Sequence, residues 1–283
     1  MKICEKMSSK IEDSIALIRK GEKLALALNP EDGYFVGFSG GKDSQVLLDL
    51  VKRAGVKYKA HYNVTTIDPP ENVRFIRQYY PEVHFIHPRQ TFIKMIEKRG
   101  LPTICHRFCC EELKEKTGAG NVVLTGVRAD ESTKRSKYNE VAIKSNRVKH
   151  ADRSKKHTIE EIEQNEHRCI KGKDAIMVYP ILNWTESEVW QYIADNHLPH
   201  NPCYDIAGRV GCMFCPFANK RQIEFFEQKY PKYKDAIMKH FRIYLANNTR
   251  TTYNMDADEY YDWWKSKKSL KKWIGEKQQM KLF

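Results

Sequence analysis

Short apolar runs alternate with longer amphipathic stretches along most of the chain. Each short run is bounded by turn-forming residues, which predicts a buried β-strand, and the stretches between them repeat apolar residues at helical spacing. The predicted strands cover residues 34–38, 58–64, 83–86, 121–126 and 176–180. Strands that alternate with helices in this way predict an α/β fold, a Rossmann-like parallel sheet with helices on both faces.

The helical pattern predicts where several helices begin and end. Residues 8–28 read as one amphipathic helix, residues 65–79 open a second with proline near its first turn, and residues 91–99 form a short third helix. Thr185 is predicted as an N-cap, with Glu188 completing a capping box. The tail, 218–283, is helical, aromatic and basic. Its tryptophans could stack nucleic-acid bases, but the pattern favours a core with a solvated face.

These elements suggest three parts: an N-terminal helix over 1–33, a nucleotide-binding α/β domain over 34–200, and a cysteine-bearing segment with a helical tail over 201–283. Residues 137–176 break the pattern, because they are polar, strongly basic and without apolar periodicity. We expect a mobile basic insertion there, which either lies over the nucleotide or contacts nucleic acid, or is an idle surface loop. His157, His167 and Cys169 within it match no zinc-binding spacing.

The turn after the first strand, Ser39-Gly40-Gly41-Lys42-Asp43-Ser44, carries the clearest chemistry. Two glycines let the backbone approach a ligand, and the following helix offers unpaired N–H groups and the positive end of its dipole. A lysine and two serines add a charge and hydroxyl donors. This combination predicts a phosphate site. It is not a Walker A loop, because aspartate follows the lysine.

A second candidate segment follows the strand at 121–126. Gly126–Arg128 lies at the carboxyl end of that strand, the edge of a parallel sheet where ligands bind. Arg128 and Arg135 suit forked contacts with phosphate or sulfate, the alternative being a solvated charged loop.

Composition narrows the class of protein. The chain has 283 residues and a net charge of +13, which favours polyanionic partners such as nucleic acid, or serves solubility alone. No apolar stretch approaches eighteen residues and the N-terminus lacks a signal-like run, so we expect no membrane contact and a cytoplasmic protein. In that compartment its eight cysteines favour metal or redox chemistry over disulfides.

Five of the eight cysteines fall in two groups about a hundred residues apart, Cys105-His106-Arg107-Phe108-Cys109-Cys110 and Cys212-Met213-Phe214-Cys215-Pro216, and a sixth, Cys203, lies close to the second group in sequence. Two such groups can supply four thiolates to zinc or to a [4Fe–4S] cluster. Adjacent cysteines and a Cys-Pro ending favour the cluster. Buried structural thiols are the alternative.

These motifs carry a family resemblance. Residues 39–44 resemble the pyrophosphate-binding (PP) loop of the adenine-nucleotide alpha-hydrolase-like superfamily, and Cys109-Cys110 with Cys212-x-x-Cys215 resembles the signature of [4Fe–4S] adenylyl-sulfate reductases. Residues 107–114, 125–132 and 201–212 extend the likeness, so that residues 34–235 resemble the phosphoadenosine phosphosulfate reductase family.

The resemblance implies a set of ligands and roles. A [4Fe–4S] cluster would be held by Cys109, Cys110, Cys212 and Cys215, and Asp43 and Asp68 are candidates for Mg²⁺. Lys42, Asp43 and Arg128 would be catalytic. ATP or an adenylyl sulfonucleotide would be bound by Ser39, Gly40, Gly41, Lys42, Asp43, Ser44, Asp68, Gly126, Arg128 and Arg135.

One departure from the family affects the reaction. Sulfonucleotide reductases attack sulfur with a cysteine in a C-terminal Glu-Cys-Gly-Leu-His segment, and here no cysteine follows Cys215. The resemblance therefore favours a cluster-dependent sulfur-transfer enzyme that uses ATP or an adenylyl sulfonucleotide, with tRNA or DNA as acceptor and a sulfur- or electron-donor protein as partner. The alternatives are a reductase with a relocated nucleophile (Cys4, Cys169 or Cys203) and a non-catalytic, cluster-bearing nucleic-acid-binding subunit.

Overall fold

The structure, a computed structural model, describes residues 2–145, 156–165, 174–248 and 255–280. The chain forms two compact units, each made of three segments. Unit 1 comprises Met1–Asn63, Glu71–Ile86 and Glu115–Tyr204, and unit 2 comprises Val64–Pro70, His87–Lys114 and Asp205–Phe283.

Unit 1 is built on a six-stranded sheet with the order β3-β2-β1-β4-β6-β5. All neighbouring strands are parallel except β5, which runs antiparallel to β6 at one edge. The strands are β1 (Tyr34–Gly37), β2 (Tyr58–Asn63), β3 (His84–Ile86), β4 (Val122–Thr125), β5 (Val141–Ser145) and β6 (Asp174–Val178). This confirms the predicted α/β class and the five predicted strands.

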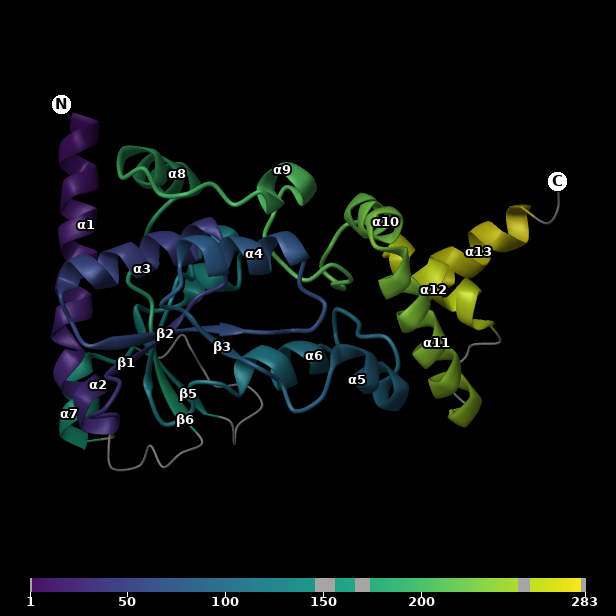
Figure 1. The fold of residues 1–283 in the computed structure, drawn as a ribbon, viewed down its shortest axis with the longest axis horizontal. Helices are drawn as coiled ribbons and strands as arrows, with labels where there is room; N and C mark the ends of the chain where they lie inside the picture. The colour runs from purple at the N-terminus through teal and green to yellow at the C-terminus, as the bar shows by residue number, and fades with distance from the viewer. Residues whose placement is uncertain (1, 146–155, 166–173, 249–254, 281–283) are drawn as a thin grey trace. The chain divides into compact units, whose positions relative to one another are not determined.

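The strand order reverses at β1, which pairs with β2 on one side and β4 on the other. Strands β1 and β2 are labelled in Figure 1. Ligands of open α/β sheets bind at such a switch point, outside the carboxyl ends of the strands. The loops after β1 and β4 begin there, since Gly37 and Thr125 are paired residues at the ends of these strands. The fold thus brings the two predicted nucleotide segments to one place.

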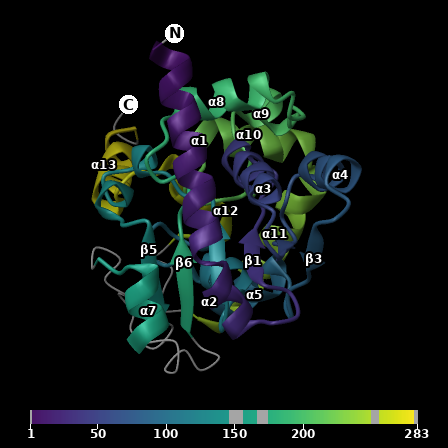
Figure 2. The same cartoon turned by 90° about the vertical axis from the view of Figure 1, so that its left-hand side faces the viewer.

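The helices around this sheet pack through apolar faces, with α1 running along α3 in Figure 2. Their bounds are α1 (Lys2–Lys20), α2 (Glu22–Leu28), α3 (Lys42–Ala54), α4 (Pro70–Tyr79), α7 (Ile159–Asn165) and α8 (Glu186–Asp195). The predicted capping box of α8 is present: Thr185 and Glu188 exchange hydrogen bonds between side chain and backbone. A five-residue helix, α9 (Cys203–Ala207), follows.

Two local predictions were wrong. The single helix expected over 8–28 is broken at Gly21, where a Cβ atom would lie 2.5 Å from the Tyr34 hydroxyl oxygen. That hydroxyl donates to the Ile18 carbonyl at 2.6 Å and closes the end of α1. The insertion over 137–176 contains β5 and α7, because pairing with β6 orders a segment too short to show periodicity. Residues 146–155 and 166–173 of the insertion, including His167 and Cys169, lie outside the described residues.

Unit 2 is helical. It contains α5 (Phe92–Arg99), α6 (Phe108–Cys110), α10 (Lys220–Lys229), α11 (Pro231–Asn247), α12 (Ala257–Ser266) and α13 (Leu270–Met280). A π-helical segment, Glu111–Glu115, continues directly from α6. Its buried core joins segments distant in sequence, and Tyr261 and Trp264 of the tail belong to this core. The Trp264 indole donates to the Pro102 carbonyl at 2.6 Å.

Within the described part of the chain, we find no helix with the length and apolar character needed to cross a membrane.

Candidate functional site

The loop between β1 and α3 is tightly wound and held by its own serines. Gly40 has a φ of +78°, and Gly41, extended at φ −79° and ψ 161°, is the N-cap of α3. The Ser44 hydroxyl accepts from the Ser39 N–H at 3.2 Å and donates to the Gly41 carbonyl at 2.8 Å. The Ser39 hydroxyl accepts from the Gly41 N–H at 3.3 Å. The two predicted serines therefore shape the loop.

Buried amides hold the carbonyl side of this loop. Asn72 donates to the Ser39 carbonyl at 3.1 Å, and Asn201 and Gln45 donate to the Gly40 carbonyl at 2.8 and 3.3 Å. Asn201 also donates to Asn72 Oδ1 at 2.7 Å, and all three amides are buried. Carbonyl oxygens that would repel a phosphate are thus bonded to protein donors, while the helix N-terminus keeps its attraction for an anion.

Lys42, the first residue of α3, lies among opposite charges and aromatic rings. Its Nζ is 3.4 Å from Asp43 Oδ2 and 3.3 Å from Glu186 Oε1, and 5.9 and 5.7 Å from the ring centroids of Trp190 and Tyr204. Its backbone N–H donates to the Tyr204 hydroxyl at 2.8 Å. Burial raises the pKa of that phenol, so the hydroxyl stays neutral at physiological pH.

Arg128 is nearly inaccessible, with 3% of its surface exposed. Its Nε donates to Asp43 Oδ1 at 2.6 Å, and its Nη1 donates to Asp130 at 3.3 Å. The two loops approach so closely that a Cβ on Gly126 would lie 2.6 Å from the Asp43 carbonyl oxygen. Arg128 therefore orients Asp43, and the structure brings Lys42, Asp43 and Arg128 together.

The other predicted arginine, Arg135, contacts the Arg128 turn through Glu131. It forms an ion pair with Glu131, whose Oε2 accepts from the Arg128 backbone N–H at 3.0 Å. Arg135 thus holds the turn that carries Arg128.

The sequence prediction missed Gln45, Asn72, Asn201 and Tyr204 as contributors to this site. Two of them could have been found from the helical pattern, because Gln45 and Asn72 are polar residues on the buried, otherwise apolar faces of their helices. Asn201 and Tyr204 entered only as part of the resemblance, without a role.

In unit 2, four cysteines line one cavity. Cys109 and Cys110 come from α6, and Cys212 and Cys215 come from a turn whose Met213 N–H donates to the Ile67 carbonyl at 3.0 Å. The cavity between them is small, about 20 Å³. The remaining lining residues are Thr65, Ile67, Leu113, Lys114, Phe214 and Pro216. The fold therefore brings both predicted cysteine groups to one place.

The thiols in this cavity are close enough to affect one another. A hydrogen bond with Cys110, burial and the negative charges of Cys212 and Cys215 raise the pKa of Cys109. Burial raises the pKa of Cys212, partly offset by the nearby Lys114 ammonium group. Four sulfurs in one cavity, with the thiol pKa of Cys109 and of Cys212 raised, form a donor set suited to a cationic metal centre. They are not arranged at metal-binding distances, since no group of three or more potential ligands of that kind occurs among the described residues.

Cys105 and Asp68 are close in sequence to residues that line this cavity, but neither of them lines it. Cys105 is exposed and is not among the residues that line the cavity. Asp68 Oδ2 accepts from the Thr65 N–H at 2.6 Å, which closes a turn. Asp68 belongs to unit 2 and Asp43 to unit 1, so shared coordination of Mg²⁺ by these two residues stays a prediction.

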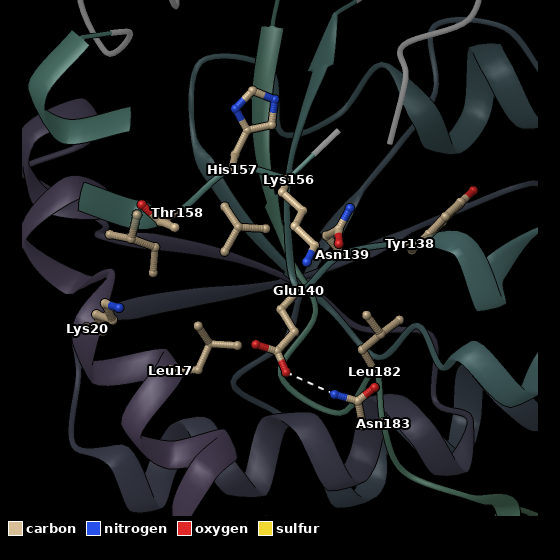
Figure 3. A pocket seen from close by; sticks show the side chains of 12 residues that line it. Leu17, Lys20, Tyr138, Asn139, Glu140, Lys156, His157, Thr158, Leu182 and Asn183 are labelled. Atoms are coloured by element: carbon tan, nitrogen blue, oxygen red, sulfur yellow. Dashed lines mark hydrogen bonds between the residues drawn. The ribbon is translucent and has the colours of Figure 1, made fainter. Parts of the chain in front are cut away.

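A further cavity, of about 380 Å³, lies in unit 1 between α1, β5 and the start of α7 (Figure 3). Its polar rim includes Lys156 and His157, and Glu140 accepts from Asn183 there at 3.0 Å. Lys20 of α1 pairs with Glu160 at 2.7 Å. The described part of the basic insertion thus packs against α1. Contact between the insertion and a nucleotide or nucleic acid stays a prediction.

Comparison with known proteins identifies relatives of the chain. Residues 33–218 match the family model for the phosphoadenosine phosphosulfate reductase domain. An uncharacterized protein of Methanocaldococcus jannaschii is 25% identical over 239 residues, covering 81% of this chain and 51% of that protein. The chain thus spans about half the length of that relative. An adenosine 5'-phosphosulfate reductase of Bacillus cytotoxicus is 26% identical over 226 residues, covering 72% of this chain and 85% of the reductase.

Solved structures give more distant matches. A phosphoadenylyl-sulfate reductase from Candida auris, in a phosphate complex, matches with a TM-score of 0.43 and 18% identity, covering 74% of this chain and 94% of the other. A U34-tRNA thiolase from Methanococcus maripaludis with its [4Fe–4S] cluster matches with a TM-score of 0.42 and 15% identity, covering 86% and 80%.

Proposed function

The chain belongs to the phosphoadenosine phosphosulfate reductase domain family, and we propose that it is a nucleotide-dependent sulfur-transfer enzyme that carries a [4Fe–4S] cluster. The observation that carries the proposal is the convergence of Cys109, Cys110, Cys212 and Cys215 on one cavity, in a chain that also has a phosphate-type loop. A fold that only needed buried thiols would not collect four of them from segments a hundred residues apart.

In this proposal the loop binds the phosphates of ATP. An oxygen of the acceptor attacks the α-phosphorus and the bond to pyrophosphate breaks, so negative charge develops on the leaving group. The Lys42 ammonium group and the N-terminus of α3 stabilise that charge. The Arg128 Nε donates to Asp43 Oδ1 at 2.6 Å and so fixes the orientation of that carboxylate. In this proposal the oriented carboxylate is a candidate ligand of Mg²⁺.

The four cysteines of unit 2 would hold the cluster, which when bound supplies a sulfur- or electron-carrying centre. The chain's own contribution there is to order the ligands. Met213 is fixed to Ile67 between the last two cysteines, and the Cys212 sulfur lies 3.5 Å from the Thr65 hydroxyl. Lys114, whose pKa is raised mainly by the negative charge of Cys212, places a cation beside that sulfur.

The proposed acceptor is a nucleic acid, tRNA or DNA, and the proposed partner is a protein that donates sulfur or electrons. A net charge of +13 supports a polyanionic acceptor. Relatives include adenosine 5'-phosphosulfate reductases, so an adenylyl sulfonucleotide is the alternative substrate of the loop.

A reductase with a relocated cysteine nucleophile is the competing function, and one observation weighs against it. Cys203, the nearest remaining thiol in sequence to the second cysteine pair, is only 2% exposed. A nucleophile must come within about 3–3.5 Å of the sulfur it attacks, which a buried thiol does not do without rearrangement.

An anaerobic turnover experiment separates these functions. Wild-type protein is supplied in turn with ATP, adenylyl sulfate and phosphoadenylyl sulfate, together with thioredoxin and candidate RNA and DNA. Release of pyrophosphate from ATP that depends on the acceptor supports the proposal. Sulfite release from a sulfonucleotide selects the reductase, and salt-sensitive nucleic-acid binding without turnover selects a non-catalytic subunit.

A further inference from the structure

Tyr204 occupies one of the hydrogen-bond donors that a phosphate would use. The backbone N–H of Lys42, the first residue of α3, donates to the Tyr204 hydroxyl oxygen at 2.8 Å. The first N–H groups of a helix have no partner within the helix, and these groups bind phosphates at helix N-termini. In this protein, one of them is already bonded to a phenol.

The Tyr204 ring also contacts the lysine side chain of the same residue. The Lys42 Nζ lies 5.7 Å from the centroid of this ring and 3.3 Å from Glu186 Oε1. Trp190 supports the ring from the side, edge to face at 5.0 Å between centroids. Tyr204 thus contacts both groups by which Lys42 would bind phosphate.

We propose that the Tyr204 hydroxyl takes the place of a phosphate oxygen in the nucleotide-free loop, and that the pyrophosphate group of the nucleotide displaces it. This inference rests on the proposed function, because it assigns Tyr204 a role at the same loop. Tyr204 then sets the affinity of the loop: only a ligand that replaces the lost hydrogen bond and recruits Lys42 binds tightly.

Hydrogen-bond strength gives the direction of the exchange. A neutral phenol oxygen is a weaker acceptor than an ionised phosphate oxygen, whose bonds to N–H groups are roughly twice as strong. The positive end of the α3 dipole favours the anion further. The raised pKa of the phenol keeps the hydroxyl neutral, so the weaker acceptor is the one in place before the ligand arrives.

The test is calorimetric titration of the full chain with inorganic pyrophosphate and with ATP, comparing wild type with Tyr204→Phe. Phenylalanine keeps the aromatic ring beside Trp190 and removes only the hydroxyl. The nucleotide-free protein therefore loses the hydrogen bond from the Lys42 N–H, whereas in the proposal the nucleotide-bound protein does not have this bond. We expect both ligands to bind roughly 2- to 10-fold more tightly, the affinity equivalent of one net hydrogen bond. Tyr192→Phe is the matched control: it removes the hydroxyl that donates to Asp49 on α3, and affinity should not change.

Each outcome of the titration supports or overturns the proposed role of the Tyr204 hydroxyl. A purely structural role for the hydroxyl predicts unchanged affinity in Tyr204→Phe, and a hydroxyl that donates to the bound phosphate predicts weaker binding. Either outcome overturns the proposal while leaving the nucleotide loop intact. If wild-type protein binds neither pyrophosphate nor ATP, the proposed function and this inference both fail.

Discussion

Replacing Gly40 by alanine tests whether the buried amides behind the loop determine its conformation. Gly40 has a φ of +78°, and an added Cβ would lie 2.5 Å from Asn72 Oδ1. That oxygen accepts from Asn201 at 2.7 Å, so Asn72 cannot move without breaking the network. Gly55, at the other end of α3, is the matched control: its φ is +71°, but nothing lies within 4 Å of its Cβ position.

Both variants lose stability because alanine is disfavoured in the left-handed backbone conformation, but only Gly40→Ala also displaces Asn72. A left-handed conformation costs alanine about 1–2 kcal/mol relative to glycine, and Gly55→Ala should lose only this amount. Gly40→Ala must also displace Asn72 and leave a buried amide or carbonyl unpaired, at about 1–3 kcal/mol. The free energy of unfolding should therefore fall by about 2–5 kcal/mol in Gly40→Ala.

Urea denaturation followed by circular dichroism measures both losses, and titration with pyrophosphate measures the function of the loop. We expect pyrophosphate binding to weaken in Gly40→Ala and to be unchanged in Gly55→Ala. Equal losses of stability in the two variants would refute the reasoning, because they would mean that the Asn72–Asn201 network does not constrain the loop.

Three further predictions follow from the two sites. Lys42→Ala should abolish detectable ATP binding while the circular dichroism spectrum is unchanged, whereas Lys52→Ala, on the same helix and paired with Glu82 at the surface, should bind normally. Anaerobically prepared protein should be brown with about four irons per chain; Cys212→Ser should lose colour and iron, and Cys105→Ser should keep both. Stoichiometric zinc without iron would contradict this. Sulfite release from either sulfonucleotide with thioredoxin should be far slower than about one per second; a faster rate that Cys203→Ser abolishes would establish the reductase instead.

The sheet was predictable because its central strands are apolar runs between turn signals. Strand β5 was missed because its order comes from pairing with β6, a tertiary contact that leaves little trace in five residues. The break at Gly21 was missed for a similar reason, since it depends on the Tyr34 hydroxyl reaching back to α1.

Short motifs of the two sites could be predicted from the sequence, but the buried amides that hold the loop could not. The loop from Ser39 to Ser44 reads directly from the sequence, whereas Asn201 reaches Gly40 from 161 residues away. The expected forked contact of Arg128 with phosphate rested on its residue type and its place after the carboxyl end of a strand. In the structure this guanidinium is buried against Asp43, a partner that only the sheet's strand order brings near.

The division of the chain into two units, each made of three segments, constrains how this protein is synthesised and dissected. The chain passes from one unit to the other five times, after residues 63, 70, 86, 114 and 204. During synthesis, Phe92 and Phe108 emerge from the ribosome more than a hundred residues before Met213 and Phe226. The core that these residues share can therefore form only after the later segment has been made. No single cut in the gene yields either unit alone, and a fragment ending before residue 205 would expose half of the second core.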